Sequence, residues 1–189
     1  MRAVASFPLA AFVVAAAVVA SPARAADYVQ APGSTLTFAS SYDGEVFSGR
    51  FPAFTTKLSF DPKQLATSKL DVVIPLAGTT TANPERDETL LGSDFFNVAK
   101  FAQARYTATR FRSLGGNRYA ADGALSLRGV SKPVTLTFTW TPGARPVLSG
   151  KATVKRLDFG IGGGDWADTA TLPNEVAVST KVVFAPPAR

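Results

Sequence analysis

The sequence predicts an all-β fold, an antiparallel barrel of about eight strands with one short helical segment near residues 84–98. Three observations carry this prediction. Apolar and polar residues alternate in segment after segment, turn-forming residues separate those segments, and only one stretch departs from the alternation. Residues 26–189 are predicted to form a single domain, which is long enough to bury a substantial core.

The alternation is clearest in the segment 175–184, where Val176, Val178 and Val182 share one face and Glu175 lies on the other. The same pattern recurs in seven further segments: 35–40, 53–60, 69–75, 105–112, 118–127, 133–140 and 146–157. Each is predicted to be a strand with one buried face. Such strands either stack as two sheets or close into a barrel, and strands about ten residues long favour the barrel.

One stretch between these strands has helical signals. Asn83 is a predicted N-cap, Pro84 suits the first helical position, acidic residues follow in the first turn, and Gly92 is a stop signal. One or two helical turns are therefore expected here, with a restart near Ser93.

The first 25 residues resemble an export signal. Arg2 supplies a positive start, residues 7–20 are apolar, and "SPARA" ends in a small-x-small cleavage pattern, which predicts cleavage after Ala25. The alternative is a membrane anchor, but Pro22 and Arg24 end the apolar run early. The chain is therefore expected to be periplasmic or secreted.

The sequence contains no cysteine and no histidine. These absences exclude disulfides, thiolate nucleophiles, Ser-His-Asp triads and His-ligated metals. The formal net charge of +6 falls to +4 without the two signal arginines, which is only mildly basic. No catalytic residue, metal or cofactor is predicted.

Phenylalanine is abundant, with fourteen residues in the chain. Several occupy alternating strand positions, and Phe95, Phe96 and Phe101 gather in and after the helical segment. Either these aromatics simply fill the core, or they line an apolar tunnel whose mouth lies near the helical segment.

Three stretches, in this order, resemble the YceI-like family. They are "TTTANPERDETLLGSDFFNVAKFAQARYTATRF", "YAADGALSLRGVSKPVTLTF", and "RLDFGIGGGDW" followed by "NEVAVSTKVVF". Ala102 is a departure, since family members commonly carry proline there. The resemblance implies an exported lipocalin-like barrel with an elongated cavity for one long-chain lipid, such as a polyisoprenoid, an isoprenoid quinone or its precursor, or a fatty amide. It also implies that the protein is often a homodimer. Separately, no enzymatic activity is predicted, and transient contact with a membrane is a further expectation.

The glycine-rich stretch "RLDFGIGGGDW" is interpreted as a bulged strand. A dinucleotide or phosphate loop would need a following helix or a Gly-Lys-Ser/Thr motif, and neither is present. Gly160, Gly162 and Gly164 then leave one face without side chains, and the resemblance places them beside the cavity. Arg156 and Asp158 share a face, so the spacing allows an exposed ion pair between them.

The acidic run "ERDE" supports two interpretations. Acids at a helix start complement the helix dipole, and the resemblance suggests that Arg86 and Asp87 form a structural clamp at the barrel mouth. The alternative is a carboxylate-dependent hydrolase acting on a lipid or sugar through Asp87, Glu88 and Asp165. A ligand-free β scaffold or adhesion module is a further alternative.

The densest basic region holds Arg105, Arg110, Arg112 and Arg118. It is interpreted as a solvated barrel face or a contact for an anionic surface. Nucleic acid is not a predicted partner, because Tyr106 and Phe111 lie an odd number of residues apart and would point to opposite faces of a regular strand.

The main hypothesis is an exported lipid carrier or sequestering protein. About half of its candidate lining residues are expected to be ordinary core. The candidates are Phe38, Phe54, Phe60, Phe96, Phe111, Leu125, Leu127, Phe138, Ile161 and Trp166.

Overall fold

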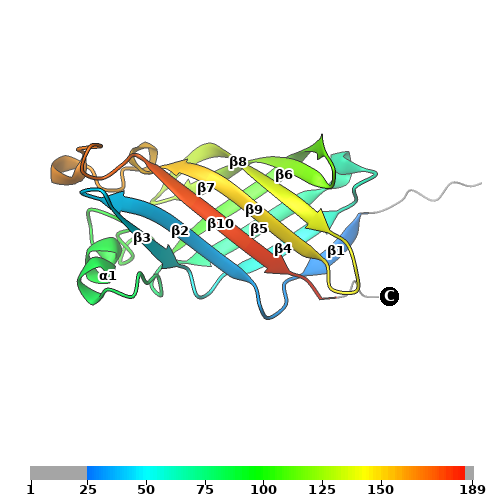
Figure 1. Ribbon diagram of the computed structural model, residues 1–189, viewed down its shortest axis with the longest axis horizontal. Coiled ribbons are helices and arrows are strands. Elements are labelled where there is room, and N and C mark those ends of the chain that lie inside the picture. Colours follow the sequence, from blue (N-terminus) through cyan, green and yellow to red (C-terminus); the bar gives the residue numbers. More distant parts are fainter. Residues whose placement is uncertain (1–24, 186–189) are drawn as a thin grey trace, which may run out of the picture.

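The computed structural model describes residues 25–185, and the predicted export signal lies outside them except for Ala25. Ten strands form one antiparallel sheet in the spatial order β1-β4-β5-β6-β7-β8-β9-β10-β2-β3 (Figure 1). The strands are β1 (Ala26–Val29), β2 (Thr35–Tyr42), β3 (Glu45–Arg50), β4 (Thr55–Phe60), β5 (Lys69–Pro75), β6 (Gln103–Gly115), β7 (Arg118–Leu127), β8 (Val130–Thr141), β9 (Val147–Lys155) and β10 (Glu175–Val183). The predicted all-β barrel is confirmed, but with ten strands instead of eight, because β1 and β3 were not predicted.

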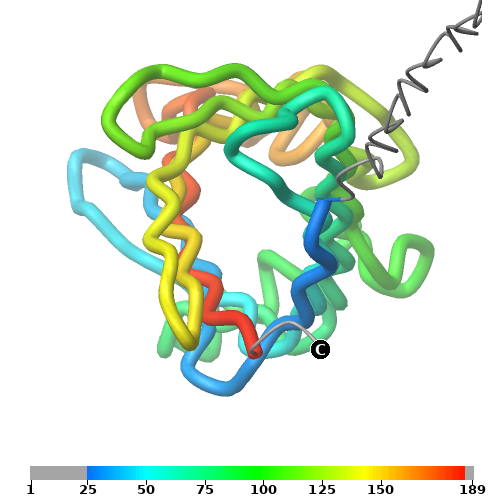
Figure 2. Tube along the Cα trace, turned by 90° about the vertical axis from the view of Figure 1, so that its right-hand side faces the viewer, coloured from blue at the N-terminus to red at the C-terminus, as the bar shows by residue number. Residues whose placement is uncertain are grey.

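The sheet curls round on itself, and a view along the barrel shows the strands arranged around a ring (Figure 2). At one end the chain after β1 joins the end of β10, where the Ala31 N–H donates to the Val183 carbonyl at 2.7 Å. At the other end Arg50, the last residue of β3, exchanges two backbone hydrogen bonds with Thr80. Short bridges therefore close the barrel at both ends of the seam.

One helix, α1 (Pro84–Leu91), lies at the end of the barrel where β5 ends and β6 begins (Figure 1). The Asn83 side chain accepts a hydrogen bond from the Arg86 N–H at 3.0 Å, and Gly92 is the C-cap. Both predicted helix ends are confirmed. Residues 93–100 continue as turns, so the expected restart at Ser93 is wrong. Among the described residues, no helix is long and apolar enough to cross a membrane.

The barrel interior is solid at the end away from α1. Phe60 lies at the centre of an aromatic cluster and contacts Tyr119, Trp140 and Phe138 with ring centroids 5.1, 5.2 and 5.7 Å apart. These three contacts are edge-to-face, the arrangement that aromatic quadrupoles favour. We call this cluster the aromatic plug, and its members are Tyr28, Phe60, Phe111, Tyr119, Phe138, Trp140 and Phe184.

A β-bulge in β6 corrects one expectation from the sequence. Ala108 pairs with Gly123, but Arg110 already pairs with Asp122, so Thr109 is an extra residue. Because of this extra residue, the side chains of Tyr106 and Phe111 lie on the same face of β6. Both point inward instead of to opposite faces. Their rings are therefore unavailable for stacking on nucleic-acid bases.

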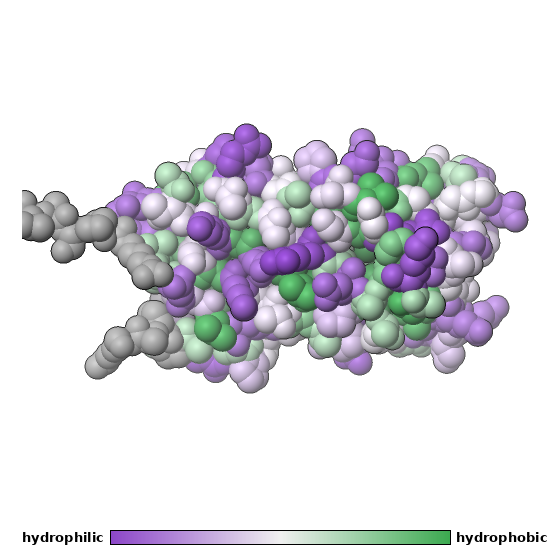
Figure 3. Space-filling view, turned by 180° about the vertical axis from the view of Figure 1, so that it is seen from behind, coloured by the Kyte–Doolittle hydropathy of each residue, from purple (hydrophilic) through white to green (hydrophobic). Residues whose placement is uncertain are grey.

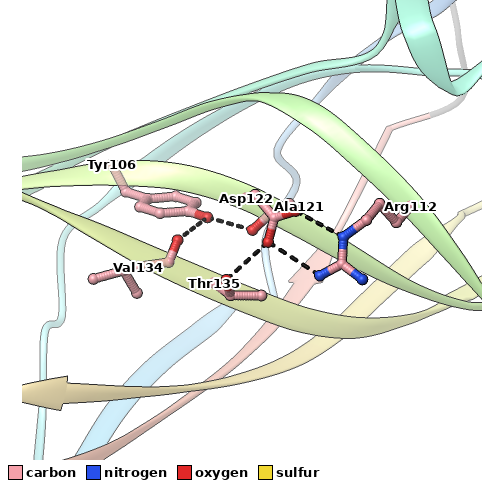
Figure 4. Close-up of polar contacts among 6 residues, drawn as sticks. All are labelled: Tyr106, Arg112, Ala121, Asp122, Val134 and Thr135. Carbon is pink, nitrogen blue, oxygen red and sulfur yellow. Dashed lines mark hydrogen bonds and ion pairs between the residues drawn. The ribbon is translucent and has the colours of Figure 1, made fainter.

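Tyr106 and Asp122 show how the two faces of this hairpin differ (Figure 4). Inside, the Tyr106 hydroxyl lies 2.7 Å from the Ala121 carbonyl and 3.0 Å from the Val134 carbonyl, and burial raises the pKa of Tyr106 to about 12. Outside, Arg112 donates two hydrogen bonds to the Asp122 carboxylate at 2.8 and 3.2 Å.

The outer face seen from behind is largely hydrophilic or neutral, with hydrophobic residues scattered across it (Figure 3). Two of the clustered arginines pair with acids on neighbouring strands, Arg105 with Asp71 and Arg112 with Asp122, each at 2.8 Å. This arrangement is typical of a solvated barrel face.

The exposed network around Asp122 predicts a pH-dependent contribution to stability. Hydrogen bonds from Arg112 and Thr135 lower the pKa of Asp122 to about 2, below its ordinary value of 3.8. Because the folded pKa is the lower one, the stabilisation is present above pH 4 and is lost as the pH falls towards 2. Asp122→Asn is therefore expected to lower the melting temperature at pH 6 but not at pH 2. An equal loss of melting temperature at pH 6 and pH 2 would contradict this account. Arg112→Gln is the matched variant, because it removes the arginine partner of Asp122 and should reduce the same pH dependence of stability.

Candidate functional site

The half of the barrel nearer α1 contains an elongated cavity of about 190 Å³. Every strand except β1 contributes to its wall, and Leu90 of α1 and Phe96 of the following turn line it at that end. A cavity of this size has room for a chain of many methylene groups, since about 10–15 Å³ already suffices for one water-sized group. Its exposed wall is almost entirely carbon, so it suits an apolar chain and not a polar substrate.

Half of the residues predicted to bind ligand line this cavity. They are Phe38, Phe96, Leu125, Leu127 and Ile161. They come from three regions, β2, β7 and the turns around the α1 end, which the fold brings together.

Three other candidates belong to the aromatic plug and not to the cavity. Phe60, Phe111 and Phe138 are 1%, 9% and 3% exposed and pack against one another in the closed half of the barrel. Of the two interpretations of the phenylalanines, core filling holds for these three rings, whereas Phe38 and Phe96 line the cavity.

Phe54 and Trp166 also lie outside the cavity wall. Phe54 is half-buried in the connection before β4, where its carbonyl accepts a hydrogen bond from the Gln30 amide at 3.0 Å. Trp166 packs on Phe95 and Tyr42, with ring centroids 5.4 and 6.1 Å apart, and so covers the end of the barrel from outside.

Arg86 and Asp87 anchor α1 separately and do not pair with each other. The Arg86 guanidinium lies 4.5 Å from the centre of the Phe47 ring, a cation–π distance. Asp87 accepts hydrogen bonds from the Thr80 hydroxyl at 2.6 Å and from the backbone and hydroxyl of Thr81. Burial alone would raise the pKa of Asp87, but these hydrogen bonds outweigh it and the pKa lies below its ordinary value. Asp87 thus fixes the helix to the segment that closes the seam with β3.

The three carboxylates considered for a hydrolase are not arranged around the cavity. Asp87 is occupied by its threonine partners, and Glu88 and Asp165 are exposed. None of the three lines the cavity wall. No pair of them therefore flanks a bound chain as acid and base.

The glycine-rich stretch is not a bulged strand, which corrects the sequence interpretation. It forms two 3-10 turns, η2 (Arg156–Phe159) and η3 (Gly164–Trp166). Gly160, Gly162 and Gly164 have φ angles of +66°, +61° and +57°, which belong to left-handed turns and are incompatible with a strand. The Gly162 N–H donates to the Asp94 carbonyl at 2.7 Å, so this segment is tied to the turn after α1.

We call residues 156–174 the capping segment, and Arg156 holds it together. Arg156 is 3% exposed, lines the cavity, and makes no ion pair within the described residues. Burial lowers the pKa of Arg156 below its ordinary value. All five of its N–H groups donate to backbone carbonyls of the segment, which belong to Ile161, Gly162, Trp166, Leu172 and Pro173. The ion pair considered with Asp158 is therefore wrong, because the guanidinium is turned inward.

The comparison with protein families identifies this arrangement. Residues 28–184 match the model of the YceI-like domain, which includes nearly every described strand residue. The chain belongs to the YceI-like family.

Relatives in other bacteria share about a third of their residues with this YceI-like chain. A UPF0312 protein of Vibrio campbellii is 34% identical over 150 residues, covering 74% of this chain and 79% of the relative. A UPF0312 protein of Shewanella baltica strain OS185 is 32% identical over 151 residues, covering 74% of this chain and 78% of the relative.

Solved structures share the YceI-like barrel. BcnA of Burkholderia cenocepacia matches with a TM-score of 0.76 and 26% identity, over 79% of this chain and 95% of BcnA. A polyisoprenoid-binding domain from Saccharophagus degradans, implicated in plant cell wall breakdown, matches with a TM-score of 0.66, over 86% of this chain and 99% of that domain. At 17% identity, the second match shows the fold alone.

Sequence reasoning missed several residues of the YceI-like cavity wall. The alternation could have found Leu36, Ile74 and Val178, because each occupies a buried-face position in a predicted strand. Phe95 belongs to the phenylalanines noted near the helical segment but is not among the predicted lining residues. No local signal marked Arg156 as part of the wall, because its position depends on how the capping segment folds back over the end of the barrel.

Proposed function

We propose that this YceI-like protein binds one long-chain amphiphilic lipid in its barrel cavity and holds it for transport, storage or protection against stress. The observation that carries the proposal is the carbon-lined cavity between the aromatic plug and α1. The proposed ligand is a polyisoprenoid, an isoprenoid quinone or its precursor, or a fatty amide. The Saccharophagus degradans domain, which has the same fold, is a polyisoprenoid-binding domain, and this supports the class of ligand.

Burial of a chain supplies free energy of the same size as the cost of association, without any covalent step. About fifteen buried carbons contribute roughly 12 kcal/mol at about 0.8 kcal/mol each. Association opposes this with about 4–15 kcal/mol, so longer chains should bind more tightly. A carrier function is favoured over a hydrolase because no carboxylate of the three candidates faces the cavity.

Export to the periplasm or medium, with cleavage after Ala25, is part of the proposal and rests on the sequence pattern of residues 1–25. Transient membrane contact follows from the ligand class, since a long-chain lipid is drawn from a bilayer. A homodimer is proposed from the family resemblance.

Native mass spectrometry of protein purified from its own host without detergent tests this function. The expected result is a stoichiometric adduct that extracts into organic solvent as a long-chain lipid, and the same spectrum shows whether the protein is a dimer. The proposal fails if the protein has its bare mass and keeps it after incubation with polyprenols, isoprenoid quinones and fatty amides. The mass of the isolated chain also reports whether cleavage follows Ala25.

A further inference from the structure

Two segments that lie far apart in the sequence cover the cavity at the α1 end of the barrel (Figure 1). One is the capping segment, which contributes Ile161 and Leu172 to the cavity wall. The other is the turn after α1, residues 92–100, which contributes Phe95 and Phe96 and which we call the post-helix turn. None of these four side chains is more than 8% exposed, so a segment has to move at this end before a ligand can pass.

The rest of the barrel offers a ligand less room to pass. The aromatic plug fills the opposite end, and the strands from β4 through β10 to β2 are joined by antiparallel ladders, whose opening breaks several backbone hydrogen bonds at once. Within residues 25–185, two places lack such a ladder: the seam between the outer strands β1 and β3, and the junction between the post-helix turn and the capping segment. At the seam, the Phe51 N–H donates to the Leu36 carbonyl at 3.0 Å, and the Phe51 ring packs on Phe38 with centroids 5.3 Å apart.

The junction is held by contacts between loops. The Gly162 N–H donates to the Asp94 carbonyl at 2.7 Å, and the ring centroids of Phe95 and Trp166 lie 5.4 Å apart. These contacts can separate without disturbing a strand, so the junction is the part of the cavity cover that opens with the least disruption.

Arg128 joins the two segments from a third element, the turn between β7 and β8. Its guanidinium donates to the Ser93 carbonyl of the post-helix turn at 2.6 Å and to the Gly160 carbonyl of the capping segment. Both carbonyls belong to loops, whereas Arg128 follows Leu127, which pairs with Val130 in the ladder of a long hairpin. One side chain on a rigid support therefore holds two loops together, and it does not line the cavity.

The backbone at Arg128 indicates that its side chain has a role of its own. Arg128 has a φ angle of +51° and Gly129 one of +76°, so both lie in the left-handed region. Arginine is uncommon there, whereas glycine and asparagine adopt it more readily. An arginine at this position therefore lowers stability unless its side chain offsets the strain through contacts such as those with the two loops.

We propose that lipid enters and leaves the cavity through the junction, and that release of Arg128 from one of the two loops controls the rate of this exchange. The inference rests on the proposed lipid-binding function and specifies the route of the ligand. Because Arg128 contacts the closed junction and not the ligand, it should slow entry and exit by the same factor and leave the equilibrium affinity unchanged.

Stopped-flow fluorescence of the apolar probe N-phenyl-1-naphthylamine measures entry into delipidated protein, and displacement by dodecanamide measures exit. Arg128→Asn keeps a residue that tolerates the left-handed backbone but removes the guanidinium. Both rates should rise about tenfold, the effect of losing roughly one net hydrogen bond from a charged donor, while the dissociation constant stays within about twofold. Arg145→Asn is the matched control, because Arg145 also donates to a backbone carbonyl but lies between β8 and β9 at the plug end, and its rates should not change.

A reversible cross-link tests the route itself, and the chain suits this test because it has no cysteine of its own. Asp94→Cys and Gly163→Cys place two thiols on opposite sides of the junction, next to the hydrogen bond between Asp94 and Gly162, and a Cβ at position 163 would meet nothing within 4 Å. Joined by dithiobismaleimidoethane, this double variant should take up the probe about a hundredfold more slowly or less, and cleavage of the linker by a reductant should restore uptake. The control is Ser126→Cys with Ser131→Cys, whose native hydroxyls lie 3.2 Å apart within one hairpin, where the same linker should leave uptake unchanged.

Unchanged entry and exit rates in Arg128→Asn would overturn the role of Arg128, even with a lower melting temperature, because that combination is expected of a purely structural side chain. Wild-type uptake by the joined double variant would overturn the route and favour the seam instead. If the wild-type protein takes up neither N-phenyl-1-naphthylamine nor dodecanamide, the proposed lipid-binding function itself fails.

Discussion

Replacing Ala152 by phenylalanine should abolish long-chain lipid binding while the barrel becomes no less stable. Ala152 lies on β9, lines the cavity and is only partly buried, so a larger side chain at this position enters the space that the ligand would occupy. A newly buried phenylalanine ring contributes about 1.5–3 kcal/mol, and phenylalanine is compatible with a strand. We expect at least a hundredfold loss of affinity for a long-chain fatty amide, since ring and chain exclude each other, with an equal or higher melting temperature.

A plug variant is the matched control for this experiment. Phe60→Leu weakens the aromatic plug and should lower the free energy of unfolding by about 1–3 kcal/mol, yet leave chain binding within a few-fold of wild type. Titration of both purified variants with the fatty amide, followed by urea unfolding, measures both effects. The cavity is misassigned if Ala152→Phe binds the amide as tightly as the wild type does.

Replacing Arg156 by methionine should lower the free energy of unfolding by about 3–5 kcal/mol, because each buried carbonyl left without a hydrogen-bond partner costs about 1–3 kcal/mol. The methionine side chain keeps much of the arginine volume but removes all five N–H donors, which leaves carbonyls such as those of Trp166 and Leu172 without their partners. Urea unfolding measures the loss, and amide hydrogen exchange should show faster exchange in the capping segment than in the strands.

Two further variants determine how the Arg156 result is interpreted. Arg145→Met removes an exposed arginine with one hydrogen bond, to the Pro32 carbonyl at 3.3 Å, and should change stability by less than about 0.5 kcal/mol. Arg156→Lys restores up to three donors and should recover part of the loss. A capping segment that exchanges as slowly in Arg156→Met as in the wild type would show that packing, and not the guanidinium, holds it.

Alternation along the chain was sufficient to predict the main strands, because each has one face against the core and one against water. It failed for β1, which has only four residues, and for β3, whose Val46 is 81% exposed at the sheet edge. It also gave the wrong parity for Tyr106 and Phe111, because a single extra residue at a bulge reverses every side chain beyond it.

Only half of the residues predicted for the candidate site line the cavity, and the reason is a different one. Phe38 and Phe138 have the same local pattern, an aromatic residue on the buried face of a strand, yet one lines the cavity and the other fills the plug. What separates them is distance along the barrel axis, which depends on strand tilt and register and not on local sequence. The inward position of Arg156 likewise depends on turns at left-handed glycines, and the local sequence did not predict those turns.

The aromatic plug has a consequence for how a ligand enters and leaves the barrel. With Phe60 and its neighbours blocking one end, a bound molecule has to leave through the same end by which it entered. The lipid donor and the lipid acceptor would then have to bind the same end of the barrel. They would bind one after the other, and the lipid could not pass from one end of the barrel to the other. The acceptor could not receive lipid while the donor remained bound to that end. The direction of net transfer would therefore depend on which of the two, donor or acceptor, is bound there.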